Sequence, residues 1–321
     1  MKTALVTGSS GFIGSHLVNY LQGSGYYVIG VDIEPEKYCK ADYFYQNDLR
    51  DYNKALEVFQ KHRKIDEVYN LACLMGGMGY IGDEKHSYDI MVGSNQIVIN
   101  IIDISLKFNI KKHFYSSSAC VYNMYKQEGL NVWLKEEDSY PAMPDLTYGW
   151  QKLFSEQMYD AARISHGFDV RIARFHNIFG FNGTWDGGKE KAPAALSRKV
   201  AMASDGDEIE VWGTGKQERS FLYIDECIVG IMRLMGSDCH IPLNIGSDET
   251  ISINDLTQMI IDISGKNLSI KNIEGNQGVM GRSSDNTLIY DKIGWKPNSR
   301  LIDGIRKTYN WINKQVINGR S

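Results

Sequence analysis

Cysteine and proline are scarce in this sequence of 321 residues, and neither forms a pattern. The five cysteines are odd in number and include no Cys-x-x-Cys pair, so neither a disulfide framework nor a zinc site is indicated. Six prolines and no Pro/Ser-rich linker argue against two freely moving domains. Because unpaired thiols suit a reducing compartment, we expect a cytoplasmic protein.

Strong net charge and long apolar runs are missing as well. A net charge of −4 provides no basic surface for nucleic acid. No run reaches about 18 apolar residues, and the opening MKTALVTG has no separate apolar leader. No His/Asp/Glu grouping has metal-site spacing. We therefore expect no nucleic acid, no membrane and no metal, and a small molecule as the partner.

The first half alternates short apolar segments with segments of helical periodicity. Apolar residues on both faces are typical of parallel strands covered by helices. The expected strands are residues 2–8, 26–32, 66–72, 113–118 and 170–175. This alternation predicts an α/β fold with a doubly wound parallel sheet, whose ligands lie beyond the carboxyl ends of its strands.

The second half has glycine-rich loops at 181–191 and 274–282 between helix-like segments. These expected helices are residues 192–204, 225–236, 253–264 and 301–315. The pattern predicts a smaller α/β substrate-binding domain over the ligand edge of the sheet. We assign residues 1–176 and about 219–247 to the first domain, and residues 177–218 and about 248–321 to the second.

The stretch TGSSGFIG follows the first expected strand and has Gly8, Gly11 and Gly14 in a G-x-x-G-x-x-G spacing. Glycines also serve ordinary turns, but this triplet lies between a strand and an amphipathic helix. There bare backbone lets a pyrophosphate approach the helix N-terminus. Asp32 ends the second strand, where a carboxylate binds the adenosine ribose and repels a 2′-phosphate. The predicted cofactor is NAD, contacted also by Phe12 and Ile13.

The stretch TYGWQK places Tyr148 and Lys152 one turn apart on one helix face. A surface pair is the simplest interpretation of such a spacing. Downstream of a nucleotide loop, however, it indicates a tyrosine that takes a proton from a substrate hydroxyl. We expect the cationic Lys152 and the positive nicotinamide ring together to lower the pKa of Tyr148 from its usual value of about 10.

The stretch SSSACVY, residues 116–122, puts a thiol just past an expected buried strand. An isolated cysteine is usually a small packing residue. At the ligand edge of the sheet, Cys120 has a second interpretation, because a thiol there can transfer protons.

These motifs together resemble the extended short-chain dehydrogenase/reductase superfamily of nucleotide-sugar epimerases and dehydratases. The matching stretches are TGSSGFIG, NDL (47–49), NLA (70–72), SSSACVY, YGWQK and RFHNIFG (174–180). The resemblance implies cofactor contacts from Asp48, Leu49 and Leu71, and a sugar contact from Ser118. Dehydratases of the superfamily have Asp-Glu after that serine, whereas this chain has Ala-Cys.

A closer resemblance, to the family of GDP-mannose 3,5-epimerases, extends over nearly the whole chain. It rests on MGGMG (75–79), GGKEKAPAA (187–195), RSF (219–221), YIDEC (223–227), NIGSDE (244–249) and GRSSDN (281–286). It implies an acid/base pair, a redox pair and a set of substrate contacts. The implied acid/base pair is Cys120 and Lys191, and the implied redox pair is Tyr148 and Lys152. The implied substrate contacts are Gly77, Ser118, Asn177, Lys191, Lys199, Gln217 and Arg282. YNMYKQ (122–127) departs from the family, which has Pro-Glu after the tyrosine.

The chemistry implied by the resemblance is internally consistent. Oxidation of the sugar at C4 makes the hydrogens at C3 and C5 acidic, and two groups flanking the ring can then invert both centres. The sequence leaves open which of Cys120 and Lys191 removes a proton, and the alternative for Lys191 is a solvated loop charge. The segment 75–79 is either a cover over the sugar or an ordinary turn.

Other functions remain open at this point. A 4-epimerase or 4,6-dehydratase acting on another nucleotide sugar is the alternative within the superfamily. A noncatalytic NAD-binding regulatory or scaffolding protein is the alternative outside it, although Ser118, Tyr148 and Lys152 are intact. The superfamily pairs through two helices of each chain, which implies a homodimer, and the candidate helices are residues 86–108 and 147–166.

Overall fold

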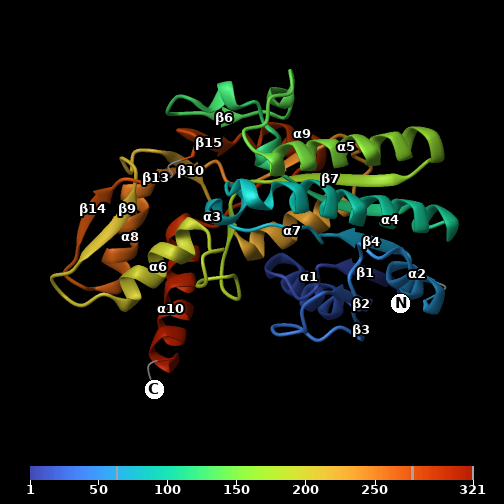
Figure 1. The fold of residues 1–321 in the computed structure, drawn as a ribbon, viewed down its shortest axis with the longest axis horizontal. Helices are drawn as coiled ribbons and strands as arrows, with labels where there is room; N and C mark the ends of the chain where they lie inside the picture. The colour runs from blue at the N-terminus through green and yellow to red at the C-terminus, as the bar shows by residue number, and fades with distance from the viewer. Residues whose placement is uncertain (63, 276–277, 320–321) are drawn as a thin grey trace.

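A seven-stranded parallel sheet, covered by helices, lies at the centre of the larger part of the structure (Figure 1). The computed structural model describes residues 1–62, 64–275 and 278–319. The strand order is β12-β7-β5-β4-β1-β2-β3, so the chain winds outward in both directions from β1 and β4. The strands are β1 (Thr3–Thr7), β2 (Tyr27–Asp32), β3 (Tyr43–Gln46), β4 (Glu67–Asn70), β5 (Lys112–Ser118), β7 (Asp169–Phe175) and β12 (Leu243–Ile245).

All five expected strands are present, and the doubly wound fold class is confirmed. The strands β3 and β12 were not predicted from the sequence. The edge strand β3 has only four residues, with two exposed positions, so it lacks a continuous apolar run. The strand β12 has three residues and is held by pairing with β7 rather than by its own pattern.

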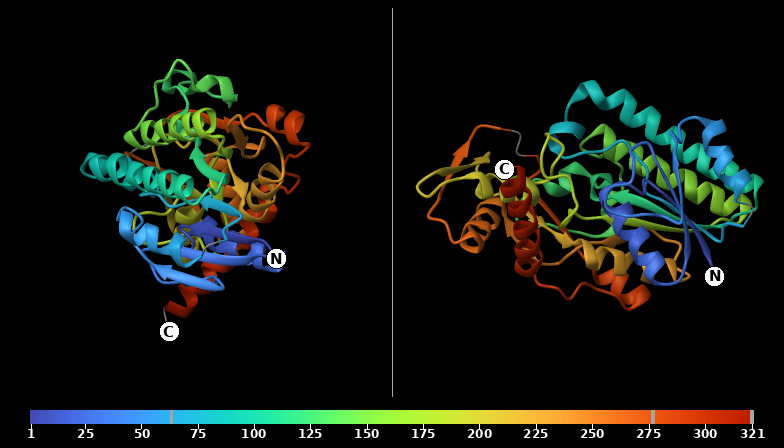
Figure 2. Two further views of the ribbon diagram at one scale, coloured as in Figure 1. Left: turned by 90° about the vertical axis from the view of Figure 1, so that its right-hand side faces the viewer. Right: turned by 90° about the horizontal axis from the view of Figure 1, so that it is seen from below.

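Helices cover both faces of the sheet, as the two perpendicular views in Figure 2 show. On one face α1 (Phe12–Gly23) packs against α7 (Ile224–Met235). On the other face α4 (Ser94–Lys107) packs between α2 (Tyr52–Lys61) and α5 (Thr147–His166). Burial of apolar residues on both strand faces stabilises this layered arrangement.

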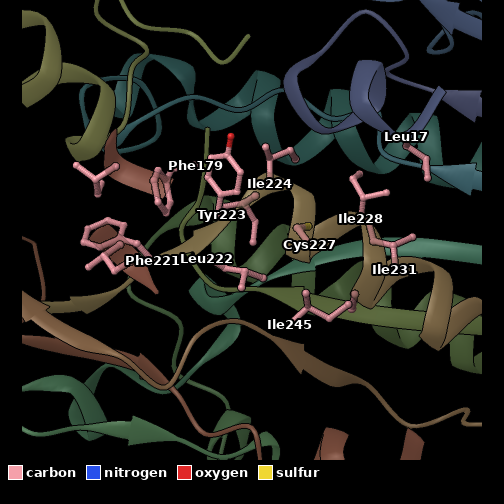
Figure 3. Packing of buried hydrophobic residues seen from close by; sticks show 14 of the residues in the cluster. Leu17, Phe179, Phe221, Leu222, Tyr223, Ile224, Cys227, Ile228, Ile231 and Ile245 are labelled. Atoms are coloured by element: carbon pink, nitrogen blue, oxygen red, sulfur yellow. The ribbon is translucent and has the colours of Figure 1, made fainter. Parts of the chain in front are cut away.

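The core under α7 joins the sheet to the C-terminal part of the chain. Figure 3 shows Ile224, Cys227 and Ile228 of α7 beside Ile245 of β12, with Phe179 at the far end of the cluster. All five side chains are at most 4% exposed. Fully burying each such aliphatic side chain contributes about 1.5–3 kcal/mol.

The segment Glu84–Lys107 is long and apolar enough to cross a membrane by length and composition. Its apolar window is 56% buried inside the protein, and its C-terminal part is α4 of the sheet's helical layer. The segment therefore has the properties of a core helix.

Smaller sheets follow beyond the carboxyl edge of the large one. The mixed sheet β13-β10-β15-β6 and the pairs β11-β8 and β14-β9 lie there with three helices, α6, α8 and α10 (Figure 1). Their bounds are β6 (Trp133–Leu134), β8 (Ile178–Phe179), β9 (Glu208–Trp212), β10 (Glu218–Ser220), β11 (Leu222–Tyr223), β13 (Thr250–Ser252), β14 (Ser269–Ile273), β15 (Gly281–Ser284), α6 (Ala192–Met202), α8 (Ile253–Ser264) and α10 (Leu301–Gly319), with the short α9 (Thr287–Ile293) between the last two of these elements. The expected helices are present within a few residues of their predicted ends.

Candidate active site

The loop between β1 and α1 allows little room for side chains. A Cβ on Gly14 would lie 2.0 Å from the carbonyl oxygen of Gly8, and Gly8 itself has a left-handed φ of +69°. The N-cap of α1 is Gly11, which has no side-chain cap, so the first N–H groups of the helix are available to an anion. Phe12 and Ile13 form the first turn. This cradle fits the pyrophosphate of a dinucleotide.

The acid after β2 organises the same loop. Asp32 accepts hydrogen bonds of 3.0 Å from the backbone N–H groups of Ser10 and Glu34. Its carboxylate is thereby held at the strand end, where the sequence analysis places the ribose. Asp48, after β3, is instead engaged by Arg50 at 2.7–3.0 Å, and this hydrogen bonding lowers the pKa of Asp48.

The turn after β4 is fixed from the neighbouring strand. The hydroxyl of Thr7 accepts hydrogen bonds of 3.2 Å from the backbone N–H groups of Leu71 and Ala72, and donates one to Asn70. Leu71 thus lies beside the glycine loop, whereas Leu49 is buried at 4% exposure next to α4. Gly8, Asp32 and Leu71 thus lie at the carboxyl ends of β1, β2 and β4, the edge at which doubly wound sheets bind their ligands.

The tyrosine and lysine of α5 are both buried, at 5% and 1% exposure. Lys152 Nζ donates a hydrogen bond of 2.7 Å to the backbone oxygen of Ser116 and lies 5.6 Å from the ring centre of Tyr148. Burial raises the pKa of Tyr148, and Lys152 opposes this rise without cancelling it. Lys152 therefore acts on the pKa of Tyr148 in the expected direction, although desolvation is the larger effect in this structure.

The end of β5 presents Ser118 and Cys120 beside this pair. The Ser118 hydroxyl accepts a hydrogen bond of 3.2 Å from the backbone N–H of Cys120 and caps a short 3-10 turn. Cys120 is 8% exposed and shares one contact cluster with Tyr148, Ile81 and Ile90. The structure therefore brings the thiol and the tyrosine of the two motifs together.

Arg282 of β15 reaches the thiol from the smaller sheet. Its Nη1 donates to Cys120 Sγ at 3.3 Å, and its Nη2 forms a salt bridge of 2.9 Å with Asp145. Its Nε donates to the side chain of Gln127. Burial opposes the charge of Arg282, but Cys120 and Asp145 raise its pKa above the usual value. The guanidinium is thus fixed on three sides at the site.

Arg219 was missed as a site residue, although its stretch RSF was part of the resemblance. It is the Cα partner of Arg282 in the parallel pairing of β10 with β15. Burial and the neighbouring Arg282 lower the pKa of Arg219 to about 9, while Asp145 and Cys120 act in the opposite direction. The Arg219 guanidinium donates to the backbone oxygens of Glu218 and Val279, each at 2.7 Å. The sequence alone did not reveal that this half-buried guanidinium and the buried one of Arg282 lie close together.

Lys191 lies at the N-cap of α6, with Pro193 in the first turn. Burial lowers the pKa of Lys191, and the electrostatic effect of Cys120 opposes this shift. The loop before it, which looks flexible in sequence, is held by Arg198, whose Nη2 donates to Glu190 at 2.8 Å. The structure therefore brings Lys191 within electrostatic reach of Cys120.

The remaining predicted substrate residues are engaged with the backbone of the protein. Asn177, Lys199 and Gln217 donate to the carbonyl oxygens of Ser220, Glu210 and Trp212, respectively, at 2.7–3.1 Å. The Oε1 of Gln217 is buried without a hydrogen-bond partner. His176 has its Nε2 2.8 Å from Asn244 Oδ1 in the core.

Comparisons with known proteins agree with this geometry. The family model described as the NAD dependent epimerase/dehydratase family matches residues 4–246. The GDP-mannose 3,5-epimerase of Arabidopsis thaliana is 45% identical over 316 residues, which are 97% of this chain and 82% of that protein. The GDP-mannose 3,5-epimerase 1 of Oryza sativa subsp. indica is 44% identical over 315 residues, with the same coverage of both chains.

The fold has close neighbours among solved structures. The UDP-glucose 4-epimerase of Thermotoga maritima has a TM-score of 0.85 at 24% identity, over 98% of this chain and 99% of that chain. The UDP-glucose 4-epimerase of Thermus thermophilus, solved with NAD, has a TM-score of 0.82 at 20% identity, over 97% and 98%. At these identities the likeness supports the fold.

Proposed function

The chain belongs to the NAD-dependent epimerase/dehydratase family, and on this premise we propose that it is a 3,5-epimerase of GDP-mannose. Relatives named for this reaction share 44–45% of its residues over nearly its whole length. The observation that carries the proposal is the buried thiol of Cys120, which shares a contact cluster with Tyr148 and lies 3.3 Å from Arg282.

The reaction begins at C4 of the mannose ring. A sugar C–H bond is not acidic enough for an enzyme base, so a neighbouring carbonyl must first be made. When bound, NAD would accept the hydride from C4 in this oxidation and return it to C4 after C5 and C3 are inverted, so that no net oxidation occurs. Tyr148 takes the proton of the C4 hydroxyl. Lys152 and Ser118 orient the phenol oxygen and the C4 oxygen between which this proton moves.

Inversion at C5 and C3 follows from the two groups that flank the ring. With a ketone at C4, the hydrogens on C3 and on C5 both lie next to a carbonyl. Removal of either proton gives an enolate, whose oxygen is stabilised by Ser118 and Tyr148. Cys120 and Lys191 act as the acid/base pair, one on each face of the ring. The lowered pKa of Lys191 brings its ammonium closer to the range in which it exchanges protons.

The diphosphate of the substrate is held by Arg219 and Arg282. Their paired positions on β10 and β15 bring two positive charges together, and a guanidinium is the group that suits phosphate oxygens. Gly77, Asn177, Lys199 and Gln217 complete the substrate set. The buried, unpartnered Oε1 of Gln217 is an acceptor available to this ligand.

We assign NAD to the cradle formed by Gly8, Gly11 and Gly14, with its ribose on Asp32. The NAD-binding domain comprises residues 1–176 and about 219–247, because β12 and α7 complete the large sheet and its helical layer. Residues 177–218 and about 248–321 form the nucleotide-sugar-binding domain. The substrate then lies where the two domains meet.

A homodimer is part of the proposal. Large apolar side chains are exposed on the two helical segments expected to pair, including Val92 at 44%, Ile99 at 46% and Phe154 at 53%. Neighbouring Trp150 is 41% exposed. Such a face is unusual on a monomer and fits a twofold contact between copies.

We place the enzyme in the cytoplasm. All five cysteines are free, as expected in a reducing compartment.

Light scattering of the purified protein tests the homodimer, and Phe154→Asp is expected to give monomers.

Product analysis tests the proposed reaction. The holoenzyme is incubated with GDP-mannose, and the sugar products are identified by NMR, with UDP-glucose in a parallel reaction. The proposal expects GDP-hexoses inverted at C5, or at both C3 and C5, from GDP-mannose alone. Conversion of UDP-glucose, or loss of water from either substrate, would assign the protein to a 4-epimerase or a dehydratase.

A further inference from the structure

Two segments far apart in sequence are in backbone contact beside the acid/base pair. The backbone N–H of Gly77 donates a hydrogen bond of 2.9 Å to the carbonyl oxygen of Lys189. A Cβ on Gly77 would lie 2.4 Å from the oxygen of Glu190, the residue immediately before Lys191. No L side chain fits at such a distance unless one backbone moves.

The same segment also contacts the other acid/base residue. Gly77 is the N-cap of the short helix α3 (Met78–Ile81). Ile81 belongs to the contact cluster of Cys120 and Tyr148, and Met78 packs against this cluster. The segment 75–81 therefore lies between the thiol on one side and the Lys191 loop on the other.

The Lys191 loop is rigid enough to transmit this contact. Glu190 is 8% exposed at its side chain, and its carboxylate accepts hydrogen bonds from Arg198 at 2.8 Å and from the Gly188 backbone at 2.7 Å. Arg198 also donates to the oxygen of Trp185 at 3.0 Å. The backbone of Lys191 is fixed in turn as the N-cap of α6.

We infer that the segment 75–81 is a spacer that sets the distance between Cys120 and Lys191, with Gly77 as its positioning residue. This inference rests on the proposed function and deepens it. Proton transfer at C3 and C5 then depends on the contact of Gly77 with the Lys191 loop. Oxidation at C4 depends instead on Tyr148 and Lys152, which lie on α5, and Lys152 is held by its hydrogen bond to Ser116 of β5.

Three variants test the spacer. Gly77→Ala forces Glu190 and Lys191 away, and Arg198→Met loosens the same loop from the other side. Gly79→Ala is the matched control, since its Cβ would lie 3.2 Å from the oxygen of Gly188 and needs a shift of only a few tenths of an ångström. Thermal unfolding of each variant shows whether the fold is kept.

The readout is a ratio of two rates at saturating GDP-mannose. Deuterium incorporation at C3 and C5 in D₂O reports proton transfer, and absorbance at 340 nm in a stopped flow reports oxidation at C4. A displacement of about 1 Å at a reacting group costs about 10²-fold in rate, so Gly77→Ala is expected to lower the ratio by about that factor. Arg198→Met is expected to lower it less, and Gly79→Ala to leave it unchanged.

The inference would be overturned if Gly77→Ala lost proton transfer and C4 oxidation to the same extent. It would also be overturned if Gly77→Ala and Gly79→Ala had the same ratio of these two rates. If Gly77→Ala does not fold, Arg198→Met decides in the same way. A crystal structure of Gly77→Ala gives an answer that needs no substrate, because the separation of Cys120 Sγ and Lys191 Nζ must differ from that in the unchanged protein. If the wild-type enzyme does not act on GDP-mannose, the proposed function is refuted. If the separation of Cys120 Sγ and Lys191 Nζ is the same in Gly77→Ala and in the wild type, the spacer is refuted.

Discussion

The guanidinium of Arg282 donates a hydrogen bond of 3.3 Å to the sulfur of Cys120, across 162 residues of sequence. Asp145 holds the other arm of the same guanidinium at 2.9 Å. A group assigned to the diphosphate thus touches a group assigned to proton transfer. Substrate binding and acid/base chemistry are therefore adjacent in this site.

Replacing the thiol separates the two stages of the reaction. Cys120→Ala is expected to lower deuterium incorporation at C3 and C5 by about 10²–10⁴-fold, the usual contribution of one acid/base group, while oxidation at C4 continues. Proton NMR in D₂O and absorbance at 340 nm measure the two stages. Cys239→Ala, at a free thiol in the connection between α7 and β12, is the control. Equal exchange in both variants would remove Cys120 from the mechanism.

Tyr148→Phe is expected to stop both stages together. Without the phenol no group takes the C4 proton, so no ketone forms and C3 and C5 stay unreactive. The expected loss is about 10²–10⁴-fold in either readout. Tyr125→Phe, at a tyrosine that is 63% exposed, is the matched control. Exchange at C5 without oxidation at C4 would contradict the assigned order.

Arg219→Met tests the diphosphate site. Loss of one charged hydrogen-bond donor costs about 1.5–3 kcal/mol, so KM for GDP-mannose is expected to rise about 10- to 100-fold with a smaller change in kcat. Arg171→Met, in the buried amino end of β7, matches the loss of a buried guanidinium away from the site. A KM that changes equally in both variants would show that Arg219 acts only on stability.

Asp32→Asn tests the choice of cofactor. The amide keeps the size of the side chain but removes the charge that repels a 2′-phosphate, so discrimination between NAD and NADP is expected to fall. Fluorescence titration of the stripped enzyme with both cofactors measures the ratio of the two dissociation constants. An unchanged ratio would place the ribose elsewhere.

Two buried histidines give the stability a pH dependence. Burial lowers the pKa of His113 to about 4 and that of His176 to about 3, from 6.5. The unfolded chain therefore binds more protons below pH 6.5, and stability present above this pH is lost as the pH falls. At pH 5.5 the loss is about 1.4 kcal/mol for each histidine.

Urea unfolding at pH 7.5 and pH 5.5 measures this loss. His113→Phe, which keeps the ring stacked 4.5 Å from Phe168, is expected to reduce the difference between the two pH values. His166→Gln, on the surface at the end of α5, is expected to leave it unchanged. An undiminished difference in His113→Phe would show that other groups dominate the acid sensitivity.

Elements with strong periodicity were predictable from the sequence. The strands β1, β2, β4, β5 and β7 are buried on both faces over most of their length, and helices such as α8 have one apolar face. The short strands of the smaller sheets were not predictable. The strand β10 has three residues, and its pairing with β13 and β15 depends on contacts distant in sequence.

The candidate site was predictable where a motif lies on one element. Tyr148 and Lys152 share one helix, and Ser118 and Cys120 share one strand end. The partners of Cys120 were not predictable, because Arg219 and Arg282 become neighbours only through strand pairing. The contact between Gly77 and Glu190 likewise requires two loops to meet in space.

The central claim is that the sugar is oxidised transiently at C4 and exchanges its hydrogens at C3 and C5. The most direct test is the NMR spectrum of GDP-hexose products formed from GDP-mannose in D₂O by the holoenzyme. The account predicts deuterium at C5, and at C3 of the doubly inverted product, with protium kept at C4. Products with protium at C3 and C5, or with deuterium at C4, would contradict it.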